Sequence, residues 1–186
     1  MTYKRIMVKL SGELFAREGG FGLNHDSLTG VAKSIKEVTD AGIEVVVVVG
    51  GGNIWRFRDT QDSGIERTSS DAIGMLATIM NGVGLQSALE SIGQFTRVCS
   101  AIDVPQLAEP YLRRRAIRHL EKARVVICAG EQEIHTSLQI VRLPLGLQSL
   151  AVMCYSRQQT STEYTIKIQT SMTMLKNMKI SPTKTV

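Results

Sequence analysis

The feature that most constrains the fold is an uninterrupted apolar run that ends in three glycines. Residues 43–53 read IEVVVVVGGGN. A strand with one solvated face alternates apolar and polar residues, whereas a strand covered on both faces is apolar throughout. The run therefore predicts a central strand of a mainly parallel sheet. Glycines directly after such a strand let the backbone approach a ligand closely, and successive N–H groups can bind an anion. We interpret residues 50–52 as a phosphate-binding loop; a plain structural bend is the alternative.

The rest of residues 1–130 alternates between strand-like and helix-like segments. Gly42 is expected to stop the first helix, and Thr68 with Asp71 has the spacing of a capping box at the start of the second. This rhythm predicts an α/β fold, an αβα sandwich with a mainly parallel sheet, whose ligands bind at the carboxyl ends of the strands. Strands are predicted at 5–9, 43–49, 95–103 and 124–130, and helices at 26–41, 69–91 and 109–123.

Length and composition limit the class of protein. A chain of 186 residues is long enough for one domain with a sizeable core. No apolar run is long enough to suggest a transmembrane helix, and the N-terminus lacks the apolar core of a signal peptide. Cys99, Cys128 and Cys154 are widely spaced. We expect small buried thiols in a reducing cytoplasm rather than disulfides or a metal site.

The net charge of +5 comes mostly from the C-terminal part of the chain. Residues 131–186 hold six Lys/Arg against three Glu, while residues 1–130 hold sixteen against fourteen Asp/Glu. The one basic cluster of the body, YLRRRAIRHLEKAR, has a helical pattern. A solvated helix face explains this cluster better than a polyanion site, so no nucleic-acid partner and no membrane partner are expected.

Three charged residues lie close to the predicted ligand edge. Lys9 precedes a Ser-Gly turn, where it could neutralise charge on a transferring phosphoryl group; an ordinary edge lysine is the alternative. Arg56 follows the glycines, where its guanidinium fork would suit a phosphate; an ordinary surface arginine is the alternative. Asp71 begins the long helix, where it would interact with the helix dipole or accept a hydrogen bond from a sugar hydroxyl. Neither a Walker A loop nor a Gly-x-Gly-x-x-Gly fingerprint accompanies these residues.

Several stretches, taken together, resemble bacterial UMP kinases of the amino-acid kinase superfamily. They are YKRIMVKLSGE, GGFGL, VVVVVGGGNIWR, SSDAIGMLATIMNGVGLQSALE and RRRAIRHLEKARVVICAG. The resemblance covers residues 3–130 and implies the amino-acid kinase fold. It implies phosphoryl transfer from ATP–Mg²⁺ to UMP, which gives UDP in pyrimidine nucleotide biosynthesis. It further implies a cytoplasmic homohexamer that GTP activates and UTP inhibits.

The resemblance also implies roles for individual residues. Lys9 would be the catalytic residue, and Gly51 and Asp71 would contact UMP. No metal ligand of the protein is implied. The residues that match the ATP site are Lys9, Leu10, Ser11, Gly12, Gly52 and Arg56. The residues that match the segment linked to GTP activation are Arg17, Glu18, Gly19, Gly20, Phe21 and Gly22.

The resemblance stops at Gly130, and the composition changes there. Fifteen of the sixteen glycines precede residue 131, and Ser, Thr and Gln supply 20 of the last 56 residues. The family continues with a second UMP loop, Gly-Thr-Gly-Asn-Pro-Phe/Tyr-Phe-Thr-Thr-Asp, and a later segment like Lys-Ala-Thr-x-Val-Asp-Gly-Val/Ile-Tyr. Neither is present. We therefore expect residues 1–130 to be the N-terminal part of an amino-acid kinase domain, truncated after the fourth strand. We expect residues 131–186 to be a poorly structured extension.

A one-base shift would explain both missing segments. Residues 131–140 can be written GAA CAG GAA ATC CAT ACT TCA CTA CAG ATA. One G placed before them gives GGA ACA GGA AAT CCA TAC TTC ACT ACA GAT, which encodes Gly-Thr-Gly-Asn-Pro-Tyr-Phe-Thr-Thr-Asp. The same shift lets RQQTSTEYTIKIQT encode the later segment. We hypothesise a one-base deletion near the Gly130 codon, either in the gene or in its reading.

Because both segments are missing, we expect UMP kinase activity to be impaired or absent in this chain. Two other interpretations remain open. The first is a non-catalytic remnant that binds nucleotides or subunits. The second is another member of the superfamily, a carbamate, glutamate or aspartate kinase. GGGNIWR together with Asp71 in SSDAIGMLATIMNG favours UMP as the acceptor over these substrates.

Overall fold

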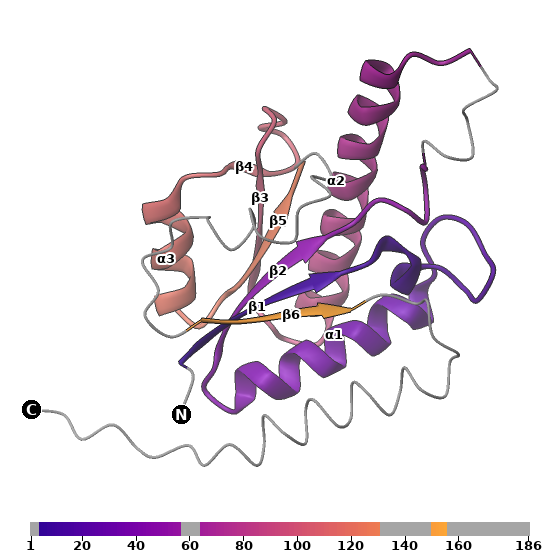
Figure 1. Cartoon of the computed structure of the whole chain (residues 1–186). Coiled ribbons are helices and arrows are strands. Elements are labelled where there is room, and N and C mark those ends of the chain that lie inside the picture. Colours follow the sequence, from indigo (N-terminus) through magenta and orange to yellow (C-terminus); the bar gives the residue numbers. More distant parts are fainter. Residues whose placement is uncertain (1–3, 57–63, 131–149, 156–186) are drawn as a thin grey trace, which may run out of the picture.

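The computed structural model describes residues 4–56, 64–130 and 150–155 (Figure 1). Their strands form one six-stranded sheet in the order β4-β3-β5-β2-β1-β6, and every pair of neighbours is parallel. The strands are β1 (Arg5–Leu10), β2 (Glu44–Val49), β3 (Thr96–Ser100), β4 (Glu109–Pro110), β5 (Val125–Ala129) and β6 (Leu150–Tyr155). The helices are the 3-10 helix η1 (Gly12–Phe15) and the α-helices α1 (His25–Asp40), α2 (Arg67–Ser91) and α3 (Arg113–Glu121).

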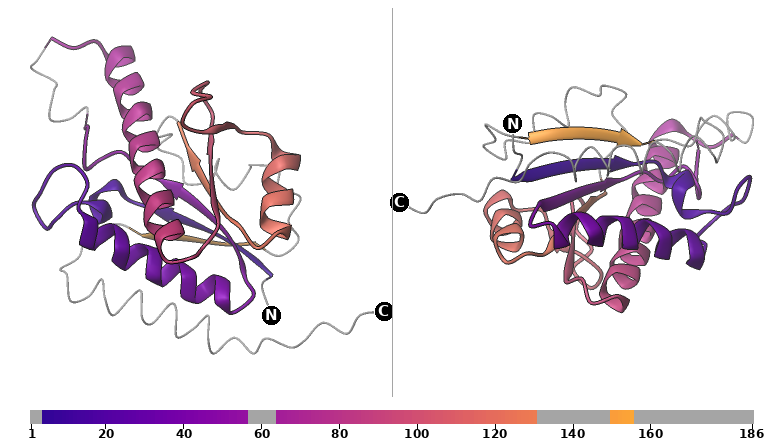
Figure 2. Two further views of the ribbon diagram at one scale, coloured as in Figure 1. Left: turned by 180° about the vertical axis from the view of Figure 1, so that it is seen from behind. Right: turned by 90° about the horizontal axis from the view of Figure 1, so that it is seen from below.

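Helices cover both faces of the sheet, as the valine run predicts. Val45, Val47 and Val49 belong to a core that includes residues of α1 and α2. Val46 and Val48 belong to a second core, in which Ala116 and Leu120 of α3 take part. Figure 2 shows the resulting layers, with α1 and α2 lying against each other. The α/β class, the parallel sheet and the αβα layering are therefore confirmed.

The start of α2 differs from the sequence prediction. The helix begins at Arg67 with Glu66 as its N-cap, and no side chain caps it. Thr68 therefore lies inside the helix, and the predicted capping box with Asp71 is wrong. The first helix does have a side-chain cap, because Asn24 Oδ1 accepts a hydrogen bond from Ser27 N at 3.0 Å. Gly42 follows that helix in the left-handed region, with φ of 80°, as expected of a C-terminal stop.

The sheet extends further than the sequence suggests. Strand β6 lies within the predicted extension and pairs with β1 along its whole length, from Arg5 opposite Leu150 to Leu10 opposite Tyr155. The two-residue strand β4 is also additional, and it pairs with the end of β3. The sheet thus has one described strand after β5 that the sequence does not predict. The remaining residues of the predicted extension lie outside the described residues.

The long helix α2 is apolar enough to cross a membrane by length and composition alone. In the structure it packs against the sheet: Leu85 and Leu89 are fully buried, and the Gly82 position lies close to Val98 and Ile127. A residue larger than glycine at position 82 would press against these two strand side chains. Its place in the core therefore explains part of the apolar character of α2, while Leu76 and Met80 of the same helix are exposed.

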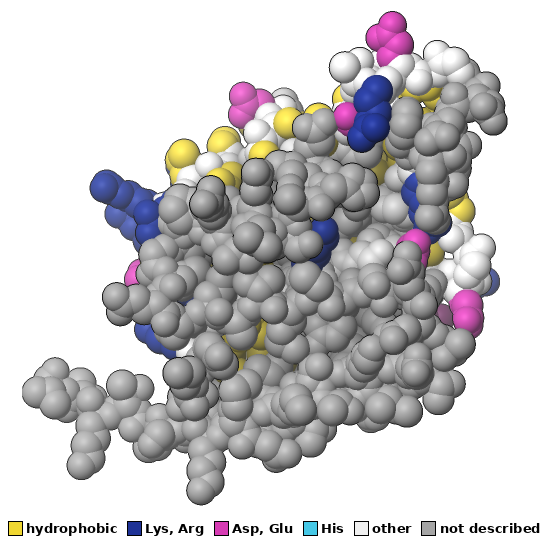
Figure 3. All heavy atoms as spheres, in the orientation of Figure 1, with side chains coloured by type: hydrophobic (Ala, Val, Ile, Leu, Met, Phe, Trp, Pro, Cys, Tyr) yellow, Lys and Arg dark blue, Asp and Glu magenta, His cyan; other side chains and the backbone are white. Residues whose placement is uncertain are grey.

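The basic cluster lies on the outer face of α3. Arg113, Arg114 and Arg118 are exposed, and Lys and Arg side chains gather at this edge of the molecule (Figure 3). Ala116 and Leu120 face the sheet instead. The arginines of the cluster thus lie on the face of α3 that points away from the sheet.

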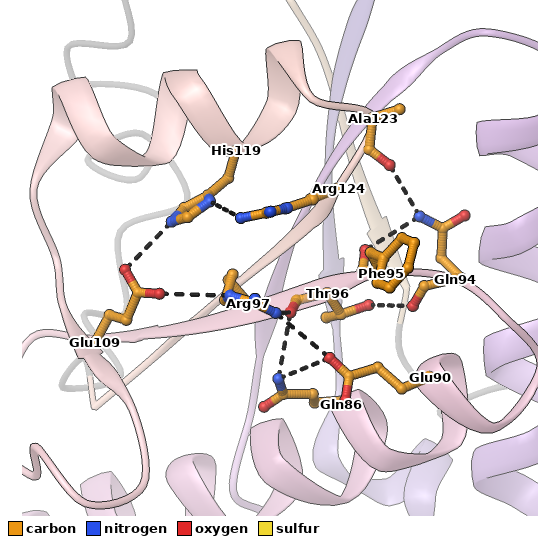
Figure 4. A network of polar contacts seen from close by, with 10 residues as sticks. All are labelled: Gln86, Glu90, Gln94, Phe95, Thr96, Arg97, Glu109, His119, Ala123 and Arg124. Carbon is orange, nitrogen blue, oxygen red and sulfur yellow. Dashed lines mark hydrogen bonds and ion pairs between the residues drawn. The ribbon is translucent and has the colours of Figure 1, made fainter.

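A polar network holds α3 to the edge of the sheet (Figure 4). Buried His119 has Glu109 Oε2 at 3.2 Å from Nε2 and Arg124 Nη1 at 3.1 Å from Nδ1. Because a guanidinium only donates, Nδ1 must accept and Nε2 must carry the proton. Glu109 also lies 3.5 Å from Arg97 Nε of β3. The network thus joins β3, β4 and α3 through the imidazole ring of His119.

Cys99 and Cys128 are buried cysteines, as expected, and Cys154 lies in a strand whose side chains are not described. Burial raises the pKa of the Cys99 thiol from 9.0 to about 11, and the nearby Glu109 carboxylate adds to the rise. The reactive thiolate is thereby depleted in the folded protein. At pH 8 we expect iodoacetamide to alkylate Cys99 at least about a hundredfold more slowly than in urea-unfolded protein. Peptide mapping by mass spectrometry measures both rates; equal rates would contradict the buried environment.

Candidate functional site

Three glycine-containing turns meet at the carboxyl edge of the sheet. Because β1, β2 and β5 are parallel neighbours, the chain leaves all three strands at the same edge, where α/β sheets bind ligands. The turns are Ser11-Gly12 after β1, residues 50–52 after β2, and Gly130 after β5. This convergence joins the sequence segments KLSG, GGGN and ICAG, as predicted.

Gly12 touches the glycine loop at a distance that no side chain would permit. A Cβ atom at this position would lie 2.5 Å from Asn53 Oδ1, 2.6 Å from Gly52 N and 2.8 Å from Gly50 O. Gly50 N also donates to Leu10 O at 2.8 Å. The backbones of the two turns are therefore in direct contact, and glycine at position 12 is required by space rather than by backbone torsion.

Gly51 and Gly52 face different neighbours. A Cβ atom on Gly51 would lie 2.9 Å from Gly74 O and 3.0 Å from Ala77 Cβ, so this glycine packs on α2. A Cβ atom on Gly52 would lie 3.5 Å from Arg56 Nε, so this glycine faces the arginine. The residues expected to serve two different substrates thus lie toward two different sides of one loop.

Lys9 lies near the carboxyl end of β1, opposite Val48 of β2. Its neighbours Val8 and Leu10 pack in the core on the α1 and α2 side, whereas Met7 belongs to the core of the α3 side. Side chains alternate along a strand, so Lys9 points to the α3 side. It is half-buried, and no hydrogen bond or ion pair to another described residue is found for it. Within the described part of the chain, no acidic side chain therefore neutralises its ammonium group.

Arg56 is held close to the glycine loop. Its Nε donates to Gly52 O at 2.5 Å, and its Nη2 pairs with Glu13 Oε1 at 2.5 Å. A guanidinium has five N–H donors, so these contacts leave donors that could bind an anion. The sequence prediction placed Arg56 near a phosphate but did not identify Glu13, which is 43 positions away.

Asp71 is the fifth residue of α2 rather than its first. Arg67 Nε lies 3.2 Å from its Oδ1, an i,i+4 ion pair on the helix surface. The carboxylate is partly exposed and lies one turn before Gly74, against which Gly51 packs. Asp71 and Gly51, the two predicted UMP contacts in the described chain, are thus both associated with α2.

Two further residues predicted for the ATP site, Leu10 and Ser11, lie at the junction of β1 and η1. The Leu10 side chain is buried in the core, so it offers a ligand no side-chain contact. Ser11 precedes η1 in an extended conformation, and its side chain does not cap that helix. Its carbonyl oxygen accepts a hydrogen bond from Leu14 N at 3.0 Å.

Residues 17–22 form an exposed loop whose far end is anchored. Gly20 N donates to Arg17 O at 2.9 Å, and Phe21 is 80% exposed. Gly22 N donates to Asn53 O at 2.8 Å, and Gly22 O accepts from Asn53 Nδ2 at 2.7 Å. The segment expected to respond to GTP therefore contacts the glycine-loop region directly.

Three polar residues at this edge were missed from the sequence. Asn53 and Asn81 hydrogen-bond to each other in the interior, and Thr78 Oγ1 accepts from Gly130 N at 2.7 Å. Thr78 and Asn81 are three residues apart, so they share one face of α2. The only signal in the sequence was the presence of two polar residues inside a strongly apolar helix.

The described residues contain no group of three or more His, Cys, Asp or Glu side chains that could hold a metal ion. Mg²⁺ is commonly bound through one or two carboxylates and the phosphates of a nucleotide rather than by a protein cage.

Comparisons with known proteins agree on one family. The model of the amino acid kinase family matches residues 4–145. A uridylate kinase of Limosilactobacillus reuteri is 58% identical over 130 residues, which are 70% of this chain and 54% of that protein. The chain thus spans about half the length of the curated relatives it matches.

Solved structures give the same result. The crystal structure of the UMP kinase from Bacillus anthracis has a TM-score of 0.77 at 35% identity and covers 86% of this chain and 67% of its own. The UMP kinase from Ureaplasma parvum has a TM-score of 0.64 at 30% identity, with 70% and 57% covered. The chain therefore belongs to the amino acid kinase family. Within that family, the matched part is a bacterial UMP kinase segment.

Proposed function

We propose that the fold and the glycine-lined edge serve phosphoryl transfer from ATP–Mg²⁺ to UMP, giving UDP. The observation that carries this proposal is the contact between the β1 and β2 turns, near the half-buried Lys9 at the end of β1. A phosphate placed there would meet backbone N–H groups and one ammonium group. These are the groups that stabilise a transferring phosphoryl group in other enzymes.

The two sides of the glycine loop suggest two subsites. ATP would lie on the side of Lys9, Ser11, Gly12, Gly52 and Arg56, and UMP would lie on the α2 side, near Gly51 and Asp71. Lys9 would neutralise charge on the transferring phosphoryl group, and the free donors of Arg56 would orient phosphate oxygens. Asp71 would accept a hydrogen bond from a sugar hydroxyl or a base. Mg²⁺ would enter as part of the ATP complex.

The wider features of the family are part of the same proposal. The protein would act in the cytoplasm, in pyrimidine nucleotide biosynthesis, as a homo-oligomer that is hexameric in the family. GTP would activate it through the segment made of residues 17–22, and UTP would inhibit it. The contact of Gly22 with Asn53 supports a link between this segment and the nucleotide loop.

For the 186-residue chain we propose nucleotide binding with impaired or absent turnover. Positioning and charge stabilisation provide nearly all of phosphoryl-transfer catalysis. The family's second UMP loop would follow Gly130, and the residues that stand there do not match it. A non-catalytic nucleotide-binding remnant is the alternative, and release of ADP that depends on UMP would exclude it.

Replacing Lys9 with methionine tests the ATP subsite. Methionine keeps most of the apolar stem but removes the charge, so we expect the dissociation constant for ATP–Mg²⁺ to rise by roughly tenfold to a hundredfold. Titration calorimetry measures the constant, with UMP, carbamate, glutamate and aspartate added in separate runs to identify the acceptor. Lys33→Met, on the exposed face of α1, is the matched control and should bind as the wild type does. Equal affinities for the Lys9 and Lys33 variants would refute the assignment of Lys9.

A further inference from the structure

Two buried asparagines at the ligand edge form a reciprocal amide pair. Asn53 follows the glycine loop, Asn81 lies in the middle of α2, and they are 2% and 0% exposed. Asn53 Nδ2 donates to Asn81 Oδ1 at 3.0 Å, and Asn81 Nδ2 donates to Asn53 Oδ1 at 2.7 Å. Nothing in the proposed chemistry uses either side chain.

The backbone fixes the orientation of this amide pair. The second donor of Asn53 goes to Gly22 O at 2.7 Å, and that of Asn81 goes to Gly50 O at 2.6 Å. Turning either amide around would bring two oxygens together at a buried carbonyl, which is costly when no water can intervene. All four amide N–H donors are therefore used, and each side chain has one arrangement available.

The pair connects three parts of the site. Asn81 holds the carbonyl of Gly50 at the end of β2, and Asn53 holds Gly22 at the end of the 17–22 loop through both backbone groups. One turn earlier in α2, Thr78 holds Gly130 at the end of β5. Helix α2 therefore holds the ends of β2 and β5 in place. Asn53 links the end of β2 to the 17–22 loop, because it bonds both to Asn81 and to Gly22.

We propose that the Asn53–Asn81 pair is a positioning device that couples the 17–22 loop to the glycine loop. The coupling rests on the proposed function only in so far as a nucleotide is the ligand of the glycine loop. A ligand that orders the glycine loop stabilises Gly22 through the pair, and a ligand of the 17–22 loop stabilises the glycine loop by the same factor. Neither asparagine is a catalytic residue, because each acts through backbone groups.

Amide exchange at Gly22 tests the coupling without any ligand. In Asn53→Ala the side-chain link from Gly22 to α2 is lost, and we expect the Gly22 N–H to exchange at least about tenfold faster than in the wild type. Asn81→Asp is the second variant: it removes both amide donors and sets a carboxylate against Gly50 O, so the same acceleration is expected. Two-dimensional NMR follows the exchange, and an unchanged rate at Gly22 in a folded variant overturns the proposal.

A buried amide at the opposite end of the sheet provides the matched control. Gln94 precedes β3, is 7% exposed, and its Nε2 donates to Phe95 O and Ala123 O at 3.1 Å each (Figure 4). Gln94→Glu removes two buried donors as Asn81→Asp does, so it reproduces the general loss of stability. It should leave exchange at Gly22 unchanged after correction for global unfolding. If Gln94→Glu accelerated exchange at Gly22 as much as the asparagine variants do, the effect would reflect a general loss of stability and the coupling would be refuted.

Exchange at Gly22 is also measured in the wild-type protein with ATP–Mg²⁺ added. ATP–Mg²⁺ at saturation should slow exchange at Gly22 by at least about tenfold, and Asn53→Ala should abolish that slowing. Gly42, whose N–H donates to Thr39 O far from the site, should not respond. Calorimetry on the same samples separates the two proposals. If ATP does not bind, the proposed function is refuted, and the exchange rates measured without ligand still test the coupling. ATP binding that leaves Gly22 unchanged refutes the coupling alone.

Discussion

Inserting one guanine directly after the Gly130 codon is expected to raise UMP-dependent ADP release by at least about a thousandfold over the 186-residue chain. If the hypothesised base is missing, the insertion restores Gly-Thr-Gly-Asn-Pro-Tyr-Phe-Thr-Thr-Asp at the end of β5. That strand end lies at the same sheet edge as the glycine loop, so the restored loop would face the proposed UMP side. Positioning both substrates is the main source of the expected gain.

The measurement is a coupled assay on purified protein, preceded by DNA sequencing across codon 130. A matched control inserts a full GGC codon at the same place, which adds a glycine but keeps the present reading frame and should leave turnover unchanged. Codons at 131–140 that do not decode to the loop after the shift would sink the reading-frame hypothesis. An unshifted chain with the turnover of an intact homologue would instead refute the proposal that this chain is impaired.

Replacing Gly12 with alanine is expected to lower the free energy of unfolding by roughly 2–4 kcal/mol. The added methyl group would collide with two backbone atoms of the glycine loop, Gly52 N and Gly50 O, and backbone moves less readily than the end of a long side chain. The two turns would have to separate, which would also disturb Asn53. Urea denaturation followed by circular dichroism gives the stability, and fluorescence of Trp55, the only tryptophan of the sequence, reports on the loop.

Gly30→Ala is the control for this experiment. Gly30 lies inside α1, and nothing lies within 4 Å of the place where its Cβ would be. Alanine there should raise stability by about 0.5–1 kcal/mol, because it reduces the freedom of the unfolded chain and suits a helix. Both substitutions add one methyl group to a glycine, yet the free energy of unfolding should fall for Gly12→Ala and rise for Gly30→Ala. A Gly12 variant as stable as the Gly30 variant would show that the turns are not in contact.

Much of the fold could be predicted because its signals are local. The valine run is apolar on both faces, and the structure buries it on both. The glycines after it, and Gly42 after α1, stand where the chain must turn, and turn residues act on their own backbone. Local signals were less reliable at the start of α2. The sequence predicted a cap at Thr68, whereas the helix begins at Arg67.

The site could be predicted only in part. Lys9, Gly12 and the glycine loop are placed by strand ends, and parallel strands bring those ends together whatever lies between them. The partners of these residues depend on distant positions: Glu13 with Arg56, Thr78 with Gly130, and Asn81 with Gly50. Sequence spacing does not predict contacts between positions that far apart, because those contacts depend on how the helices pack against the sheet.

The sequence by itself determined the class of fold, the central strand and the edge at which a ligand would bind. These follow from hydrophobic periodicity and turn residues, which act over a few neighbouring positions. Only the tertiary structure decided that β6 continues the sheet beside β1, that Gly51 and Gly52 face different sides, and that Asn53 and Asn81 hold the loops together. Those features depend on the packing of α2 across the strand ends, because buried polar groups find their partners only when distant segments meet.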